Sequence, residues 1–313
     1  MTKGTSSSRQ RIGFIGLGAM GLPMAKNLAR KLGCTVQAYD VRSDILANVE
    51  TWGGKAASSP ADVTRESDIV ITMLPDETAV LKVLCGAGGV IEGARAGLSV
   101  IDFSTIGPWA LKEAAVRLAA KGASVHGGAV TLGVAAAEKG ELAVYLDSMA
   151  ADDPQIKPVV AAFSKTIIPT GDLANSKLIK LINNLMVAVN VAATAEAVAV
   201  AAKAGLPPEA LVPLIRKGSG ASYALNNHIA NAAITGDTGP GKFGVNYILK
   251  DLEIAQEMAR RTTQTAFFGA LSVSAYRGTK AMGYGPNYYP IVLRWIELAA
   301  GQAAAGSKTT GRT

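Results

Sequence analysis

The sequence is poor in the residues on which disulfide and metal chemistry depends. Its 313 residues include only two cysteines and two histidines. Cys34 and Cys85 form no CxxC pair, which excludes a disulfide framework and is typical of reduced thiols. We expect no metal site. The amino-terminal stretch MTKGTSSSRQR lacks the apolar core of a signal peptide, so we expect a cytoplasmic protein.

Charge is also scarce, at 18% of residues, whereas 49% are hydrophobic, which excludes a disordered chain. The net charge of +7 could suggest a nucleic-acid partner, but five of these charges belong to two tails that contain no acidic residue. No basic stripe is interleaved with aromatics. We therefore expect no nucleic-acid partner. The five tail residues are Lys3, Arg9, Arg11, Lys308 and Arg312.

Residues 174–205 form an apolar run long enough to suggest a transmembrane helix. Leucine is scarce in it, and polar or charged side chains interrupt it. These features favour a helix buried between two domains over a membrane span, and we expect no membrane partner. The interrupting residues are Lys180, Asn183, Asn184, Asn190 and Glu196.

A glycine-rich turn follows the first apolar stretch and precedes an amphipathic helix that ends near Gly33. A second strand is expected over residues 35–40, and it ends in an acidic residue about 20 positions after the glycine turn. A GxGxxG turn between a strand and a helix, followed by such an acidic residue, is typical of a dinucleotide-binding fingerprint. Such glycines let the backbone approach a pyrophosphate at the helix amino end. The residues expected to contact the cofactor here are Gly16, Leu17, Gly18, Ala19, Met20, Gly21, Asp40, Val41 and Arg42.

Asp40 favours NAD over NADP, because a carboxylate accepts hydrogen bonds from the ribose hydroxyls and repels a 2′-phosphate. Arg42 could still neutralise such a phosphate, which leaves NADP open. A structural role for Asp40, as a helix cap or turn residue, is the alternative.

Further strands are expected in residues 67–75, 98–105 and 123–130, with helical stretches between them. Alternating strands and helices predict a doubly wound parallel sheet of the Rossmann type. Beyond about residue 170 only helical patterns remain. We therefore expect an α/β fold with a dinucleotide-binding domain over residues 10–172 and an all-helical domain over residues 173–303, joined by the long helix.

Few side chains qualify for proton chemistry. His126 stands at an expected strand end with no arginine or acidic partner beside it in the sequence; such a histidine is more often a packed polar residue than an acid or base. His228 is expected on a helix surface. Lys180 and Asn184 are four residues apart and share a helix face, which makes Lys180 the stronger candidate. The alternative is a lysine whose stem covers apolar surface at a helix start.

Together these stretches resemble the β-hydroxyacid dehydrogenase family, of which 3-hydroxyisobutyrate dehydrogenase is the best-known member. GFIGLGAMGLPMAKNL, TMLPDETAV, DFSTIGP, KLINN and FGVNYILKDLEIA stand in that family's order and cover roughly residues 11–255. Five ordered motifs are far more specific than any one alone.

The resemblance implies roles for the matching positions. Lys180 would be the catalytic acid and base, and Asn184 a substrate ligand. Ser104 and Thr105 would lie near the substrate carboxylate, with Thr105 also beside the nicotinamide. The remaining implied cofactor contacts are Leu74, Pro75, Phe243 and Lys250.

Oxidation of a 3-hydroxy acid removes a hydride from the carbinol carbon and a proton from its hydroxyl. A lysine with an ordinary pKa would be protonated near neutrality, but apolar surroundings and a positive nicotinamide both disfavour the ammonium form. In the reverse direction the ammonium would protonate the carbonyl. We therefore expect a small anionic hydroxy acid or semialdehyde as substrate.

The chain departs from the family pattern in GGAVTLGVAAA, where the family has a glycine-rich substrate loop. Thr131 replaces a serine, Leu132 replaces a glycine, and Gly133 is kept. A branched side chain at Leu132 would narrow or reshape the pocket. Tyr288 and Tyr289 are either pocket residues or packing residues.

Two other functions compete with this one. The first is an NADPH-dependent imine reductase, whose fold is similar but which typically has Asp or Tyr where Lys180 stands. The second is a nucleotide-binding redox sensor or scaffold without activity. We also expect a homodimer or homotetramer, because the Ala-rich helices expose more apolar surface than one chain covers.

Overall fold

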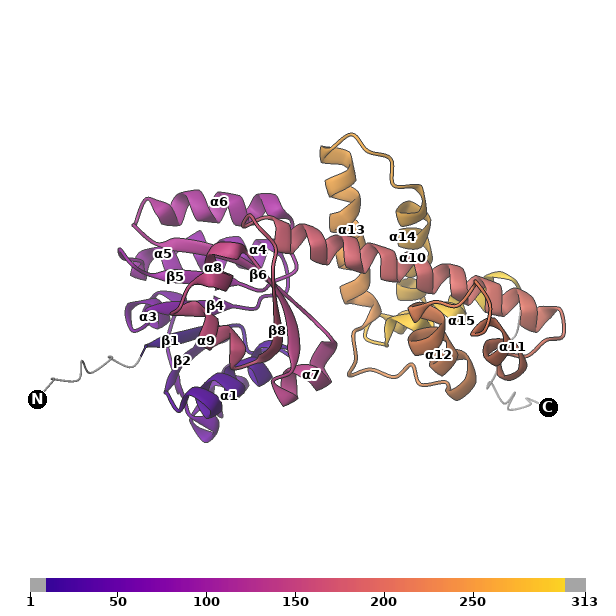
Figure 1. Cartoon of the computed structure of the whole chain (residues 1–313), viewed down its shortest axis with the longest axis horizontal. Helices are drawn as coiled ribbons and strands as arrows, with labels where there is room; N and C mark the ends of the chain where they lie inside the picture. Colours follow the sequence, from indigo (N-terminus) through magenta and orange to yellow (C-terminus); the bar gives the residue numbers. More distant parts are fainter. Residues whose placement is uncertain (1–9, 302–313) are drawn as a thin grey trace, which may run out of the picture. The chain divides into compact units, whose positions relative to one another are not determined.

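The computed structural model describes residues 10–301, and the chain divides into two compact units, Met1–Lys180 and Leu181–Thr313 (Figure 1). The division falls after Lys180, whereas the sequence suggested a boundary after residue 172. The first six residues of the long helix α10 (Asn175–Lys203) therefore belong to the first unit.

The first unit contains one eight-stranded sheet in the order β3-β2-β1-β4-β5-β6-β7-β8. Every neighbouring pair is parallel except β6 and β7, which are antiparallel. This confirms the doubly wound α/β prediction. The strands are β1 (Ile12–Ile15), β2 (Val36–Tyr39), β3 (Gly54–Ala56), β4 (Ile69–Thr72), β5 (Ser99–Asp102), β6 (Ser124–Thr131), β7 (Leu142–Leu146) and β8 (Ser164–Pro169).

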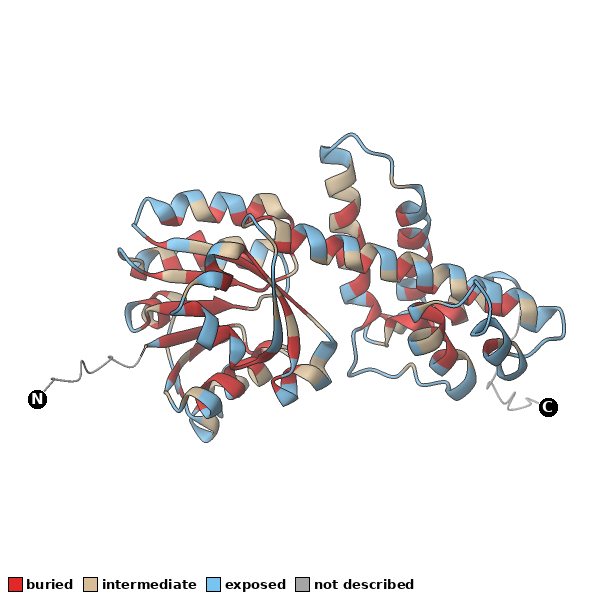
Figure 2. Ribbon diagram, in the orientation of Figure 1, coloured by how far each residue is buried: buried red, intermediate tan, exposed pale blue. Residues whose placement is uncertain are grey.

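Successive residues of the central strands pack on opposite faces of this sheet. Phe14 contributes to one apolar cluster and Ile15 to the other, and Ile101 and Val100 divide in the same way. All four residues of β1 and of β4 are buried, as in a strand covered by helices on both sides (Figure 2). Both strands were expected from the sequence, and both lie inside the sheet.

Helices cover both faces of the sheet. Helix α1 (Gly21–Leu32) packs Met24 and Leu28 into one cluster, and α6 (Pro108–Ala119) packs Leu111 into the other. The other helices of this unit are α2 (Ser43–Leu46), η1 (Val49–Trp52), α3 (Pro60–Arg65), α4 (Glu77–Cys85), α5 (Val90–Gly93), α7 (Gly133–Lys139), α8 (Ser148–Asp152) and α9 (Ile156–Ala161).

The second unit is helical over the part of it that the structure describes. Its core packs the middle of α10 against α13 and α14 around the buried Tyr276. Besides α10, its elements are α11 (Pro208–Ile215), η2 (Leu225–Ile229), α12 (Ala230–Thr235), α13 (Val245–Arg261), α14 (Phe267–Thr279), η3 (Lys280–Tyr284), η4 (Tyr289–Ile291) and α15 (Val292–Ala299).

Helix α10 is long and apolar enough to span a membrane by length and composition alone. Its most apolar 18-residue window has a mean hydropathy of 1.9, and 28% of that window is buried. Ile182, Met186 and Val200 remain exposed. Within a single chain the helix is thus less buried than the sequence led us to expect.

Candidate active site

The glycine turn between β1 and α1 has the geometry of a phosphate cradle. Gly16 has a φ of +95°, and its N–H donates to the carbonyl oxygen of Tyr39, 2.9 Å away. A Cβ on Gly21 would lie 1.9 Å from the Gly16 oxygen, whereas a Cβ on Gly18 would meet nothing within 4 Å. Met20, the cap residue, offers no side-chain hydrogen bond to the helix start, and the first turn contains no acidic residue. The turn therefore fits an anionic pyrophosphate.

Asp40, at the end of β2, is buried and braces this turn. Its Oδ2 accepts from the backbone N–H of Leu17 at 2.7 Å, and its Oδ1 accepts from the backbone N–H of Arg42 at 3.0 Å and from Nε at 3.1 Å. Burial alone would raise the pKa of Asp40, but these hydrogen bonds outweigh it and lower the pKa. The carboxylate is thus charged and partly neutralised by Arg42, so both suggested roles of Asp40, turn residue and ribose acceptor, are open to it.

A pocket of about 1010 Å³ adjoins the glycine turn. Its lining includes Leu17 and Gly18 and three basic side chains, Lys26, Arg30 and Arg42. Val41, also predicted to contact cofactor, is 83% exposed beside it. A basic pocket next to a phosphate cradle suits the adenosine half of a dinucleotide.

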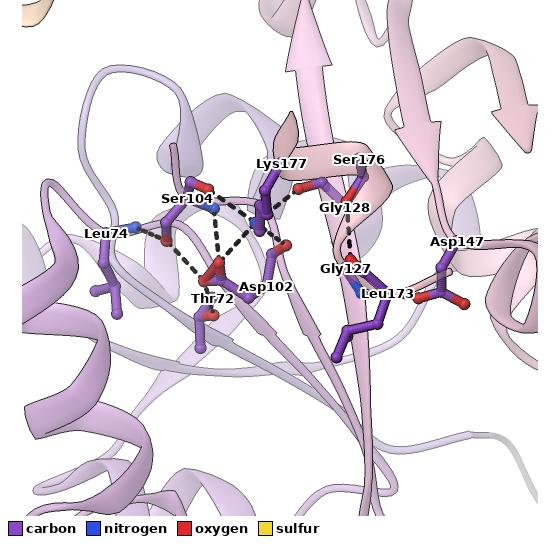
Figure 3. A network of polar contacts seen from close by, with 10 residues as sticks. All are labelled: Thr72, Leu74, Asp102, Ser104, Gly127, Gly128, Asp147, Leu173, Ser176 and Lys177. Carbon is purple, nitrogen blue, oxygen red and sulfur yellow. Dashed lines mark hydrogen bonds and ion pairs between the residues drawn. The ribbon is translucent and has the colours of Figure 1, made fainter. Parts of the chain in front are cut away.

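The carboxyl ends of β4 and β5 are tied together through Ser104. Its hydroxyl donates to Asp102 Oδ2 at 2.7 Å and accepts from the Leu74 backbone N–H at 2.9 Å (Figure 3). Ser104 is fully buried, Thr105 beside it is half-buried, and Pro75 is exposed. The structure therefore brings Leu74, Ser104 and Thr105 together, with the Ser104 hydroxyl engaged inside the protein.

A lysine that the sequence analysis overlooked lies beneath this loop. The Lys177 ammonium is fully buried, 2.8 Å from Asp102 Oδ1. It also donates to the carbonyl oxygens of Asp102, Ser104 and Gly128 at 2.6 to 2.7 Å. The sequence did contain a signal for Lys177, because it is a second charged residue in the apolar helix, three residues before Lys180.

Lys180 is half-buried and lies one turn after Lys177 on α10. Lys177 holds this turn against the carboxyl end of β5. Ligands of open α/β sheets bind at the carboxyl ends of parallel strands. Lys180 therefore stands in a region where acid–base chemistry is expected.

The substrate loop predicted from the resemblance joins β6 to α7. Leu132 has a φ of +81°, a left-handed conformation that favours glycine, and its side chain is 64% exposed. Gly133 follows with a φ of +76°, and Thr131 is half-buried at the strand end. The chain thus keeps the glycine conformation while carrying a leucine.

In the second unit, Asn184 is held by an acidic residue of the KDL motif. Its Nδ2 donates to Asp251 Oδ2 at 2.6 Å, and its Oδ1 accepts from Asn183 at 3.0 Å. Lys250 Nζ lies 3.1 Å from Asp251 Oδ1. Asn184 and Lys250, predicted from separate motifs, therefore meet at one carboxylate.

Phe243 belongs to an aromatic cluster in the same unit. Its ring stacks on Tyr247 at 5.9 Å and lies edge-on to Tyr289. Tyr288 lies 2.6 Å from His228 Nδ1, and burial lowers the pKa of His228. His228 is thus half-buried in packing, and the prediction of a surface histidine is wrong.

His126 also differs from its prediction. It lies inside β6, paired with Ile101, and is buried with Nδ1 3.3 Å from Asp147 Oδ1. An acidic partner is therefore present, 21 residues away in the sequence. Asp147 also accepts from the backbone N–H groups of Gly127 and Ala150, so the pair is built into the sheet as a packed polar contact.

The fold, the glycine cradle and Asp40 together define a nicotinamide-dinucleotide-dependent oxidoreductase. Residues 11–171 match the family model of the NAD-binding domain of 6-phosphogluconate dehydrogenase. Residues 174–295 match the model described as NAD-binding of NADP-dependent 3-hydroxyisobutyrate dehydrogenase.

Relatives of known function place the chain more closely. It is 34% identical to 2-(hydroxymethyl)glutarate dehydrogenase of Eubacterium barkeri, over 95% of this chain and 98% of the relative. The solved structure of Mycobacterium tuberculosis 3-hydroxyisobutyrate dehydrogenase with L-serine superposes with a TM-score of 0.82 at 27% identity, over 92% of this chain and 99% of the other. The chain belongs to the β-hydroxyacid dehydrogenase family and is an NAD(P)-dependent enzyme.

Imine reductases share the fold at a greater distance. The enzyme from Bacillus cereus superposes with a TM-score of 0.60 at 17% identity, over 91% of this chain and 98% of the other. Such a likeness shows the fold alone.

Proposed function

We propose that the enzyme interconverts a small 3-hydroxy acid and its semialdehyde or 3-oxo acid, with Lys180 as the acid–base group. The observation that carries this is the position of Lys180, one turn beyond a lysine that contacts the end of β5 and the middle of β6. A nicotinamide cofactor would supply the hydride acceptor for oxidation of the carbinol carbon and the hydride donor for the reverse reaction.

The chain's own residues divide the remaining work. Lys180 takes the hydroxyl proton during oxidation and returns it to the carbonyl oxygen during reduction. Asn184 shares its helix face and is fixed by Asp251, so its amide orients the reacting oxygen. Thr105, Thr131 and the backbone at Leu132 and Gly133 hold the substrate carboxylate.

We propose NAD as the preferred cofactor, with NADP accepted. The buried Asp40 carboxylate disfavours a 2′-phosphate. Arg42 offsets part of that repulsion, since it is ion-paired to Asp40 and 51% exposed at the pocket. Gly16–Gly21, Leu74 and Pro75 are assigned to the phosphates and nicotinamide, and Phe243 and Lys250 to the cofactor from the second unit.

The exposed apolar residues of α10 support a homodimer or homotetramer, and we propose the cytoplasm as its location. Light scattering at micromolar concentration tests the assembly, and a monomer would contradict it.

Turnover of a panel of 3-hydroxy acids, followed by the near-ultraviolet absorbance of NADH, tests the reaction. Lys180→Ala should lower kcat by about 10²- to 10⁴-fold while NADH affinity stays within threefold. Lys121→Ala removes an exposed lysine of the first unit and serves as the matched control. Normal turnover by Lys180→Ala would refute the mechanism. Faster turnover of a cyclic imine with NADPH would favour an imine reductase.

A further inference from the structure

The Lys177 ammonium joins the segments of the first unit that carry the predicted substrate and proton-transfer residues. Its three carbonyl acceptors lie at both ends of the Asp102–Ser104 turn and on β6, three residues before Thr131. Lys180 is one turn along the same helix. A single buried group therefore connects the loop of Thr105, the strand leading to Thr131, and the turn of Lys180.

Asp102 extends the same network to β4. Its Oδ2 accepts from the hydroxyls of Thr72 and Ser104, both at 2.7 Å, and its Oδ1 accepts from the Ser104 N–H at 3.1 Å. Through Ser104 the network reaches the Leu74 N–H (Figure 3). Thr72, Asp102, Ser104 and Lys177 are all fully buried.

The segment that leads into α10 packs against β6 so closely that a side chain on Gly127 would clash with it. A Cβ on Gly127 would lie 2.0 Å from the Leu173 carbonyl oxygen and 2.8 Å from Ser176 Oγ. A Cβ on Gly128 would lie 2.4 Å from the Phe103 ring. A shift of the start of α10 would therefore displace β6, and through Gly128 and Phe103 the loop after β5.

Lys177 has no solvent-facing role, because its side chain is fully buried. A buried ion pair contributes little net stability compared with an apolar pair of the same volume, so its retention requires another explanation. Four acceptors between 2.6 and 2.8 Å restrict the ammonium to one position.

We propose that Lys177 is a positioning residue for the reaction, which sets Lys180 against the loops that hold the substrate carboxylate. This inference rests on the proposed function. Lys177 does not touch substrate or cofactor, and it acts through Lys180, Thr105 and Thr131.

The first test is Lys177→Met, which keeps the length of the side chain and removes the ammonium. Its kcat should fall about 10²-fold, as expected for reacting groups displaced by about 1 Å. The Kd for NADH, from fluorescence titration, should change much less than kcat, because the glycine turn and Asp40 lie outside the network and Leu74 is the assigned cofactor contact that the network reaches through Ser104.

The double variant Lys177→Met with Asp102→Asn separates positioning from stability. Its buried pair is neutral, and the amide introduced in place of the Asp102 carboxylate can donate to the Thr72 and Ser104 hydroxyls, so it should fold even where Lys177→Met does not. We expect its Tm to rise above that of the single variant while kcat stays within threefold of the single variant's value, since a thioether cannot donate to three carbonyls.

Ile156→Ala, a buried change on α9, which packs against α8 and β8, provides the stability-matched control and should keep kcat within threefold. Wild-type kcat in the double variant would overturn the inference, as would an equal loss of kcat in the control. If the wild type and Lys121→Ala are active, Lys180→Ala is inactive and the double variant is fully active, only the inference fails. An inactive wild type overturns the proposed function and the inference with it.

Discussion

Leu132 offers a direct test of whether a strained backbone lies in the proposed substrate loop. Its φ of +81° and ψ of −2° place it in the left-handed region, where a non-glycine residue costs about 1–2 kcal/mol. Replacement by glycine relieves that cost but adds about 0.5–1 kcal/mol of unfolded-state entropy. Replacement by alanine keeps the strain.

At most positions an Ala variant is more stable than a Gly variant, but at Leu132 we expect the reverse. The Gly variant should be the more stable by about 0.5–1 kcal/mol, which follows from the two terms above. For 313 residues, at about 2.1 cal/mol/K of unfolding entropy per residue, that difference corresponds to a Tm higher by about 1–1.5 °C. Leu132 is 64% exposed, so about a third of its side chain is buried. Loss of that buried apolar surface costs about 0.5–1 kcal/mol in either variant.

Thermal and urea unfolding monitored by circular dichroism measure this ranking. Val116, 74% exposed on α6, is the control, because at an ordinary helix position Ala should exceed Gly by about 1 kcal/mol. An Ala variant of Leu132 as stable as its Gly variant would refute the strain. Kinetics on the same proteins show whether Leu132 also selects the substrate, since the Gly variant should accept bulkier hydroxy acids.

Three further predictions concern charged side chains and hydroxyls. Arg42→Ala should lower kcat/KM with NADP about tenfold and with NAD less than threefold, because a charged hydrogen bond contributes about 1.5 kcal/mol; equal losses with both cofactors would contradict this. Hydrogen bonds to Asp147 outweigh the effect of burial and lower its pKa, so its stabilisation is full above the unfolded value of about 3.9 and is lost as the pH falls through the folded pKa. The difference in unfolding free energy between wild type and Asp147→Asn should thus shrink as the pH falls through the folded pKa of Asp147. Ser104→Ala should lower stability by about 1–3 kcal/mol, because it leaves the Leu74 N–H without its acceptor, whereas Thr105→Ala should mainly raise the substrate KM.

The fold was largely predictable because its signals are local. The glycine turn, the helix after it and Asp40 at the end of β2 fall within about 30 residues, and their spacing follows from one βαβ unit. The short edge strand β3 and the strands β7 and β8 had no such signal. β7 runs antiparallel to β6. The direction of a strand depends on the strand with which it pairs, and the local alternation of residues does not show this.

The site was predictable as a set of motifs but not as a set of contacts. The Lys177–Asp102 pair joins residues 75 positions apart, and the Asn184–Asp251 pair joins residues 67 positions apart. Neither the spacing of the lysines nor the match to a motif predicts which carboxylate a given side chain contacts. His126 shows the same limit, because its acidic partner, Asp147, lies at the start of α8, beyond the next strand.

The buried carboxylates of Asp102 and Asp251 belong to motifs that also carry a predicted substrate or cofactor residue. Asp102 precedes Ser104 in DFST, and Asp251 follows Lys250 in KDL. Each carboxylate binds a polar side chain that the resemblance assigns to substrate, Ser104 in one case and Asn184 in the other. A carboxylate that holds its neighbours inside the protein keeps reacting groups in place before substrate arrives, and such preorganisation lowers the barrier more than an additional direct contact does. In this enzyme the acidic residues of the motifs are therefore expected to act on kcat through the residues that they hold.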